Sequence, residues 1–367
     1  MTGPTIPTDP RTPPLPQLQK LFMEALVACS EHDANALTRA WLDDGLGAES
    51  LLLDVLAPCQ EEIGALWASG TLTVVQEHFA TAISERAATL AMAHPSVRAI
   101  PPRGRITMAC VPGEWHALAA RLAADVLRLR GWSVTYLGPH VPTGQLARYL
   151  AGFEVGLLAL SSSMTTRLPQ AHAAIRAAHQ TGVPVLAGGA GFGGRGEYGR
   201  RLAAEAVAVT ARTAAELLDT TAFGPVRPLT RVTFEPPHVE EYLLLRGGRA
   251  ALLGEITGRS REGERAGDGD GASDGQDTGG RSSGRYGSGG YGDVECAGHV
   301  LDFLLAAVYM DDVTVLRDGV RWLGSVARPN TVSGTFRPRD ALLVLARRLQ
   351  DFPRAREFAE KVGTDST

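Results

Sequence analysis

The spacing of apolar residues changes twice along the chain and divides it into three parts. From Leu18 to Met92, apolar residues recur three and four positions apart, which predicts amphipathic helices. We expect an N-terminal four-helix bundle over residues 16–95, with helices at about 16–30, 33–44, 48–67 and 73–93. The prolines at positions 95, 101 and 102 then indicate a linker.

Short apolar runs alternate with helical spacing between Gly104 and Leu218. This alternation predicts a doubly wound parallel sheet, a Rossmann-like (flavodoxin-like) domain over residues 104–218. We expect strands at about 105–111, 133–137, 155–160, 183–187 and 206–209, and helices at about 116–130, 143–151, 168–180 and 197–204. Ligands of such sheets bind at the carboxyl ends of the strands.

Helical spacing returns after Pro225 and predicts a C-terminal helical domain over residues 226–367. We expect helices at about 238–256, 295–309, 312–327, 337–351 and 353–362. Residues 258–293 contain 13 glycines and almost no large apolar group, so we predict a disordered loop. Residues 1–15 are rich in proline and threonine and predict a disordered tail. The fold class is thus α/β with all-α flanks.

Composition excludes several classes of protein. The net charge is −4 and the basic residues are scattered, which argues against nucleic-acid binding. Four widely spaced cysteines favour a reducing compartment over a disulfide framework. No apolar run reaches 18 residues and the N-terminus lacks the pattern of a signal peptide, so we predict a cytoplasmic protein without membrane contact.

The segment Gly113-Glu114-Trp115-His116 follows the first predicted strand. We expect His116 to open a helix at the carboxyl edge of the sheet, within reach of a flat, metal-bearing ligand. A histidine suits axial ligation of a metal, and Glu114, two positions earlier, can hold its second ring nitrogen. An isolated histidine is more often a surface or core residue, so this pair needs support from the rest of the edge.

Small residues end two further strands at the same edge. Gly188 and Gly189 follow the fourth strand and would let a bulky ligand approach the backbone, although a tight turn also explains them. Ser161, Ser162 and Ser163 end the third strand, and they place hydroxyl groups there or cap the next helix.

Together these residues resemble the cobalamin-binding domain of corrinoid proteins. The family's Asp-x-His-x-x-Gly element corresponds to residues 114–119, with Glu114 for Asp and Ala119 for Gly. The resemblance implies that His116 binds the cobalt from below and that the nucleotide tail passes Ser161 to Ser163 and Gly188–Gly189. The family's Ser-x-Leu serine is Leu158 here, so the polar contacts of the tail must shift to nearby serines.

A second motif lies in the bundle, where nine residues separate Trp67 from Glu77-His78. It resembles the signature of the B12-dependent photoreceptors related to light-sensing transcriptional repressors. The resemblance implies that the bundle caps the upper face of adenosylcobalamin, with Trp67 against the adenosyl group and Glu77 and His78 beside it. An indole and a carboxylate suit a nucleoside. A core tryptophan and a helix-dipole glutamate are the alternative.

The C-terminal helices, appended to these two domains, resemble the photocobilins, which pair cobalamin with biliverdin. The resemblance implies a possible bilin near the corrin. His140 stands at the end of the second strand, where it would contact either chromophore; the alternative is a loop histidine without such a role. Trp115 lies in the same cofactor-binding segment as His116. Cys296 is a candidate for a thioether to a bilin, although a lone cysteine at a helix start more often has no such role.

We therefore expect a photoreceptor, not an enzyme, in which light breaks the cobalt–carbon bond and changes domain packing or a homo-oligomeric state. No helix-turn-helix precedes the bundle, so we expect no direct DNA binding and an output through an effector protein. Ala68 stands where related repressors can carry a second cobalt-binding histidine. A corrinoid methyl carrier is the main alternative, and a mutase subunit would need a partner chain for its substrate barrel.

Overall fold

The computed structural model describes residues 13–224, 234–257, 293–326 and 337–365. Its contacts divide the chain into two compact units. The first contains residues 1–66 and 75–237, and the second contains residues 67–74 and 238–367. We describe each unit by itself.

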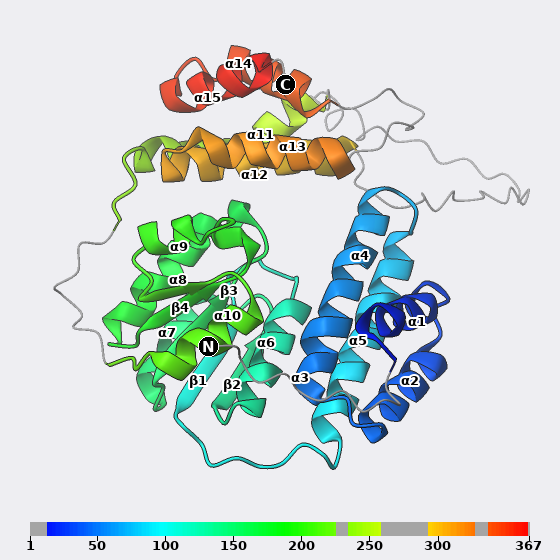
Figure 1. Ribbon diagram of the computed structural model, residues 1–367. Helices are drawn as coiled ribbons and strands as arrows, with labels where there is room; N and C mark the ends of the chain where they lie inside the picture. Colours follow the sequence, from blue (N-terminus) through cyan, green and yellow to red (C-terminus); the bar gives the residue numbers. More distant parts are fainter. Residues whose placement is uncertain (1–12, 225–233, 258–292, 327–336, 366–367) are drawn as a thin grey trace, which may run out of the picture. The chain divides into compact units, whose positions relative to one another are not determined.

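Four helical rods form the N-terminal part, as the apolar spacing predicts (Figure 1). They are α1 (Leu15–Val27), α2 (Glu31–Asp43), a continuous rod of α3 (Ala48–Ser50), η1 (Leu51–Leu56) and α4 (Ala57–Ala68), and α5 (Val74–Ala93). Their buried stripes meet in a core that includes Leu18, Phe22, Leu52, Ile63 and Ile83. Apolar periodicity does not predict that η1 is a π-helix. The four apolar side chains Leu51, Leu52, Val55 and Leu56 are nevertheless all buried there.

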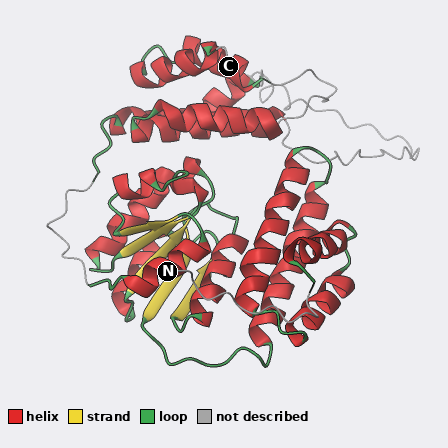
Figure 2. Cartoon of the chain, viewed as in Figure 1, coloured by secondary structure: helices red, strands yellow, loops and turns green. Residues whose placement is uncertain are grey.

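Five parallel strands follow, in the order β2-β1-β3-β4-β5 (Figure 2). They are β1 (Arg105–Cys110), β2 (Ser133–Gly138), β3 (Leu157–Ser161), β4 (Val185–Gly188) and β5 (Ala206–Ala208). This order is the flavodoxin-like one, and it confirms the predicted Rossmann-like fold. The inner strands β1, β3 and β4 are almost wholly buried, in keeping with their continuous apolar runs.

Helices cover both faces of the sheet (Figure 1). On one face α6 (Leu118–Leu129) packs against α10 (Ala211–Thr220), and on the other α7 (Thr143–Gly152) packs against α8 (Leu168–Gln180). A shorter helix, α9 (Glu197–Arg201), precedes β5. Two predictions need correction. Helix α6 begins at Leu118, so His116 lies in the loop before it, and α10 was not predicted.

The missed helix α10 has a local start signal. The Thr210 hydroxyl accepts a hydrogen bond from the Thr213 amide, and the Thr213 side chain bonds back to the amide of Thr210. This reciprocal pair is a capping box made with threonine at both positions. The usual pattern has Glu or Gln at the second position, which is why the sequence does not reveal the box readily.

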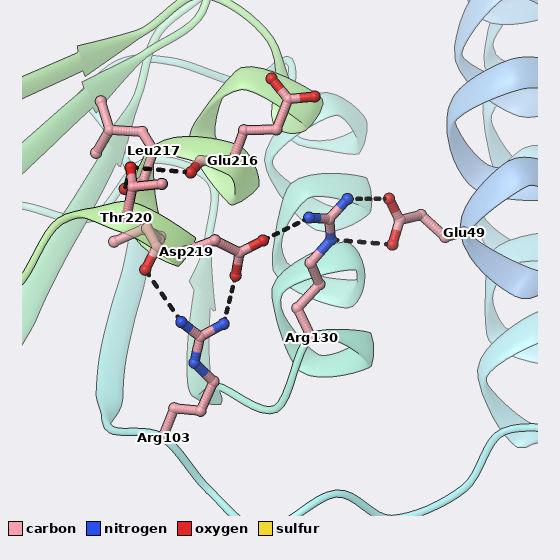
Figure 3. A network of polar contacts seen from close by, with 8 residues as sticks. Glu49, Arg103, Arg130, Glu216, Leu217, Asp219 and Thr220 are labelled. Carbon is pink, nitrogen blue, oxygen red and sulfur yellow. Dashed lines mark hydrogen bonds and ion pairs between the residues drawn. The ribbon is translucent and has the colours of Figure 1, made fainter. Parts of the chain in front are cut away.

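An ion-pair network joins the N-terminal helices to the sheet domain (Figure 3). The Arg130 guanidinium, at the end of α6, donates to both carboxylate oxygens of Glu49 at 2.7 and 3.1 Å. Its remaining nitrogen donates to Asp219 of α10 at 2.7 Å, and Asp219 also pairs with Arg103. Arg103 and Arg130 together lower the pKa of Asp219 against the opposing effect of burial.

The second unit is helical, as predicted. It contains α11 (Val239–Ile256), α12 (Asp293–Met310), α13 (Val313–Val326), α14 (Pro338–Arg348) and α15 (Pro353–Thr364). Helix α12 packs against α11, α13 and α15, and its apolar side chains are almost all buried. Gly319 of α13 permits a close crossing, because a Cβ there would lie 2.3 Å from the Phe303 ring. Helix α14 ends at Arg348, three residues before the predicted end.

Other predictions on this part cannot be compared with the structure. The predicted disordered loop lies outside the described residues except for Asp293, which begins α12, and the predicted tail is described only from residue 13. None of the helices in the described ranges is long and apolar enough to cross a membrane.

We predict that Arg130→Gln lowers the free energy of unfolding of the first unit by about 1–2 kcal/mol, because two carboxylates lose a shared, half-buried partner. Urea unfolding followed by circular dichroism measures this change. Arg86→Gln is the matched control, since Arg86 pairs with Glu31 on the exposed surface of the N-terminal helices. That variant should lose at most about 0.5 kcal/mol. Equal losses for both variants would contradict the role we give to Arg130.

Candidate functional site

The strand register brings the predicted site residues to one edge of the sheet. Cys110 of β1 pairs with Ser161 of β3, which pairs with Gly188 of β4, and Gly188 pairs with Ala208 of β5. Backbone bonds continue the ladder beyond the strands: the Ser162 amide donates to the Gly188 carbonyl at 3.0 Å. Four strands therefore end level, and the loops that follow them share one surface.

Glu114 lies at the centre of this edge, with 1 % of its side chain exposed. One carboxylate oxygen accepts hydrogen bonds from the amide and the Nδ1 of His116, at 3.0 and 2.5 Å. The other accepts from the Ser163 amide at 2.7 Å and the Ser162 hydroxyl at 3.3 Å. Burial acts to raise the pKa of Glu114, but the bonds and charge of His116 and the Ser163 amide outweigh it and lower the pKa to about 2.

The imidazole of His116 is held by one nitrogen and open at the other end. Because Glu114 is ionised, Nδ1 carries the proton that it donates, which leaves Nε2 as the nitrogen that can bind a metal. The side chain is 61 % exposed. The hydrogen bond to Glu114 raises the pKa of His116 against the effect of burial; the charges of Glu114 and Glu77 add to the rise, and that of Arg167 opposes it.

His140 supports the same loop from the end of β2. Its Nδ1 accepts a hydrogen bond from the Gly113 amide at 2.9 Å, and its own amide donates to the Glu114 carbonyl at 3.0 Å. Its ring stacks on Trp115, with centroids 4.9 Å apart and planes 7° from parallel. Trp115 is 67 % exposed, so the stack presents an aromatic face at the surface.

A cavity of about 80 Å³ that opens to solvent lies between the sheet and the helices α6 and α10, and we call it the channel. Small residues from four strands and two helices line it, among them Ala119, Ala123, Ser161, Gly188, Gly189 and Thr210. Its volume is below the roughly 300–1,000 Å³ of typical ligand pockets. Of the three predicted serines, only Ser161 lines it, since Ser162 and Ser163 bind Glu114.

The two glycines after β4 are required by close backbone contacts. Gly189 has a φ of +93°, and a Cβ there would lie 2.4 Å from the Ser162 carbonyl oxygen. At Gly188 a Cβ would lie 3.1 Å from the Ala208 carbonyl oxygen, on the side of the channel. The tight turn that we considered for these glycines is therefore present at Gly189. Both Gly188 and Gly189 also line the channel. Ala119 narrows it where the family has glycine, and Leu158 is buried within β3.

Glu77 and His78 lie in the first turn of α5 and contact each other, with 2.5 Å between the Glu77 carboxylate and His78 Nδ1. The other carboxylate oxygen of Glu77 accepts from the Thr81 hydroxyl at 2.9 Å, and Thr81 accepts from the Gln60 amide at 2.6 Å. The charge of Glu77 adds to the rise in the pKa of His116.

Trp67 lies in the last turn of α4, where its carbonyl accepts a hydrogen bond from the Gly70 amide. With residues 68–74 it belongs to the second compact unit, whereas Glu77, His78 and His116 belong to the first. Ala68 ends α4.

The sequence analysis did not predict two parts of this edge, the start of α10 and Arg167. Thr210 and Ala211 line the channel from the start of α10, and only the capping box would have indicated them. Arg167 lies against Gly113, with its Nη1 3.1 Å from the position of a Cβ there. No spacing in the sequence connects residues 113 and 167.

Within the described residues, no three histidine, cysteine, aspartate or glutamate side chains cluster as a metal site. A metal bound here through His116 would therefore have to bring its other ligands with it, as the cobalt of a corrin does. The single open histidine, its buried carboxylate and the adjoining channel fit that group.

Comparison with known proteins agrees with this geometry. The family model of the B12 binding domain matches residues 104–219, and a second B12 binding domain model matches residues 18–90. The chain is 36 % identical over 143 residues to the HTH-type transcriptional repressor CarH of Myxococcus xanthus. The match covers 37 % of this chain and 46 % of the repressor, so the chain spans less than half of that relative.

Among solved structures, the monomethylamine corrinoid protein of Methanosarcina barkeri is similar with a TM-score of 0.47 and 18 % identity, covering 56 % of this chain and 98 % of that one. A cobalamin-binding protein of Desulfitobacterium hafniense has a TM-score of 0.32 and 17 % identity, covering 57 % of this chain and 98 % of that one. Residues 18–90 and 104–219 thus match models of B12 binding domains, and part of the chain is similar to a transcriptional repressor.

Proposed function

We propose that the protein is a light sensor that holds adenosylcobalamin between its N-terminal helices and the carboxyl edge of its sheet. His116 binds the cobalt of the base-off form, and Trp67, Glu77 and His78 cap the adenosyl group. The observation that carries the proposal is the hydrogen bond between His116 Nδ1 and the buried Glu114 carboxylate, at 2.5 Å, which leaves Nε2 of a 61 % exposed imidazole open at this edge of the sheet.

Bound adenosylcobalamin supplies a cobalt–carbon bond that visible light breaks. The residues of the chain hold the parts on either side of that bond. Glu114 fixes the tautomer of His116, because its ionised carboxylate keeps the proton on Nδ1 and leaves Nε2 as a ligand. Trp115 and His140 support the loop, and Ser161, Gly188 and Gly189 line the channel for the nucleotide tail.

On the upper side, Thr81 and Gln60 orient the Glu77 carboxylate through a chain of hydrogen bonds. Glu77 is 24 % exposed, so it can accept hydrogen bonds from ribose hydroxyls. Loss of the adenosyl group would remove the contact between this carboxylate and the ligand. We propose that domain packing or the oligomeric state of the protein then changes, and that an effector protein reads the change in the cytoplasm.

A corrinoid methyl carrier of a methyltransferase system is the alternative function. A methyl carrier must open its upper face to partner proteins and gains little from groups that suit a nucleoside. Trp67 and Glu77 therefore favour the sensor, which is not an enzyme. The relative named above is a repressor, and its likeness to this chain supports a regulatory role, which we propose to act through an effector protein and not through DNA.

We predict that light changes the protein loaded with adenosylcobalamin but not the protein loaded with cyanocobalamin. Because the free cofactor is itself photolabile, the readout is the elution volume of the loaded protein in size-exclusion chromatography, before and after green light, together with its absorption spectrum. A photostable spectrum, or identical elution in darkness and light with unchanged small-angle scattering, would contradict the sensor.

We predict that Glu77→Gln and Trp67→Ala reduce the preference for adenosylcobalamin over methylcobalamin, because they remove groups that would contact only the adenosyl ligand. Dissociation constants from absorption titrations in darkness measure the preference. His94→Gln, at the other end of α5, is the control and should leave it unchanged. If the wild type binds both forms equally, the methyl carrier becomes the better interpretation.

We predict that His116→Ala abolishes the His-bound spectral form, and that Glu114→Gln weakens cobalamin binding about 10–100-fold. Glu114→Gln should also lower the pKa of His116 in the free protein, because it removes the negative partner that raises it. Proton NMR of the histidine ring measures that pKa. Binding by the wild type should weaken as the pH falls through it, since the protonated ring cannot bind a metal. Glu154→Gln is the control, because Glu154 pairs with Arg105 at the other end of β1.

A bilin site in the C-terminal helices stays a separate proposal. Among the described residues of the second unit, a cavity of about 10 Å³ is lined by Arg249 and apolar side chains such as Leu245 and Leu301. This is below the roughly 300–1,000 Å³ of typical ligand pockets. We predict that added biliverdin gives a red-absorbing complex only if these helices are present. The same complex from a chain ending before Pro225 would contradict the assignment.

A further inference from the structure

Arg167 brings a positive charge to the carboxyl edge of the sheet. It precedes α8, in the short turn η2 (Thr165–Arg167). Its guanidinium packs against the Gly113 backbone, with Nη1 and Cζ 3.1 and 3.3 Å from the position of a Cβ at residue 113. Gly113 has a φ of +84°, so the absence of a side chain there both permits the turn and makes room for the guanidinium.

This contact places Arg167 beside the loop that would carry the corrin, because Gly113 stands in that loop three residues before His116.

The carboxylates around Arg167 are engaged elsewhere. Glu114 accepts four hydrogen bonds from His116, Ser162 and Ser163. Glu77 accepts from Thr81 and contacts His78. Within the described part of the chain, Arg167 forms no ion pair with either of them. A half-buried guanidinium of this kind favours an anion, and the amino end of α8, which begins at Leu168, adds to the positive potential.

We propose that Arg167 binds the phosphodiester of the nucleotide tail of cobalamin. The proposal rests on the cobalamin site proposed above. The tail carries one negatively charged phosphodiester between the corrin and its terminal base, and a planar guanidinium suits phosphate oxygens through paired hydrogen bonds. Ser161 begins the loop that carries Arg167 and lines the channel for the tail. Arg167 would thereby select complete cobalamins over corrinoids without a nucleotide.

The test compares two ligands that differ in this group. Cobinamide has the corrin and cobalt but lacks the phosphodiester, ribose and base. We would measure dissociation constants of hydroxocobalamin and aquacobinamide, by absorption titration in darkness, for the wild type, Arg167→Gln and Arg167→Lys. Arg105→Gln is the control for net charge, because Arg105 pairs with Glu154 at the opposite end of β1.

Arg167→Gln should weaken cobalamin binding about 10–100-fold, as loss of a charge-assisted hydrogen bond does, and change cobinamide binding less than about threefold. Arg167→Lys should lie between the wild type and Arg167→Gln, and Arg105→Gln should match the wild type. The cobalamin affinity of the wild type should fall with added KCl more steeply than that of Arg167→Gln.

Equal weakening of both ligands, or of neither, would overturn the role of Arg167 while leaving the cobalamin site intact. If the wild type binds neither corrinoid, the proposed function itself fails, and the role of Arg167 fails with it. Circular dichroism and urea unfolding of each variant separate a loss of binding from a loss of folding. A destabilised Arg167→Gln protein that still distinguishes the two ligands as the wild type does also counts against the proposal.

Discussion

The site depends on one buried carboxylate. Glu114 comes from the loop after β1, yet two of its four hydrogen bonds go to residues that follow β3, and the other two go to His116. Glu114 therefore joins the loops after β1 and β3, and it also orients the His116 imidazole. A carboxylate so deeply buried is tolerable only when its hydrogen bonds favour the ionised form, and its low pKa is the expression of that balance.

Small side chains line the channel beside this carboxyl edge of the sheet. The channel exists because alanine, glycine, serine and threonine stand where strands of this kind could carry valine or leucine. The close approach of Gly189 to the Ser162 carbonyl holds the loops after β3 and β4 together, and Gly188 lies as closely against the Ala208 carbonyl of β5. Rigid loops and a preformed cavity reduce the ordering that a ligand must impose when it binds.

Sequence patterns predicted most of the architecture, because apolar spacing reports burial directly. They placed the start of α6 two residues too early, at His116, since nothing in residues 112–118 distinguishes a loop from a first helical turn. The pairing of Glu114 with His116 could be predicted from the sequence, because the two residues are two positions apart. The sequence could not predict the hydrogen bonds from Ser162 and Ser163 to Glu114, or the contact of Arg167 with Gly113. These contacts depend on the order of the strands and not on spacing along the chain. The family resemblance suggested the serines for the tail, whereas the backbone turns two of them towards Glu114.

Ion pairs contribute to the contact between the N-terminal helices and the sheet domain. Arg130 with Glu49 and Asp219, and Arg212 with Asp54, join the two parts through ion pairs. Such pairs depend on geometry and contribute little once their partners separate by a few ångström, whereas an apolar interface loses free energy steadily with exposed area. A pair of domains held in this way can be closed by a ligand that bridges them and released when the bridge is lost. The cobalamin proposed above would be such a bridge, and the loss of its adenosyl group would then change the packing of both domains.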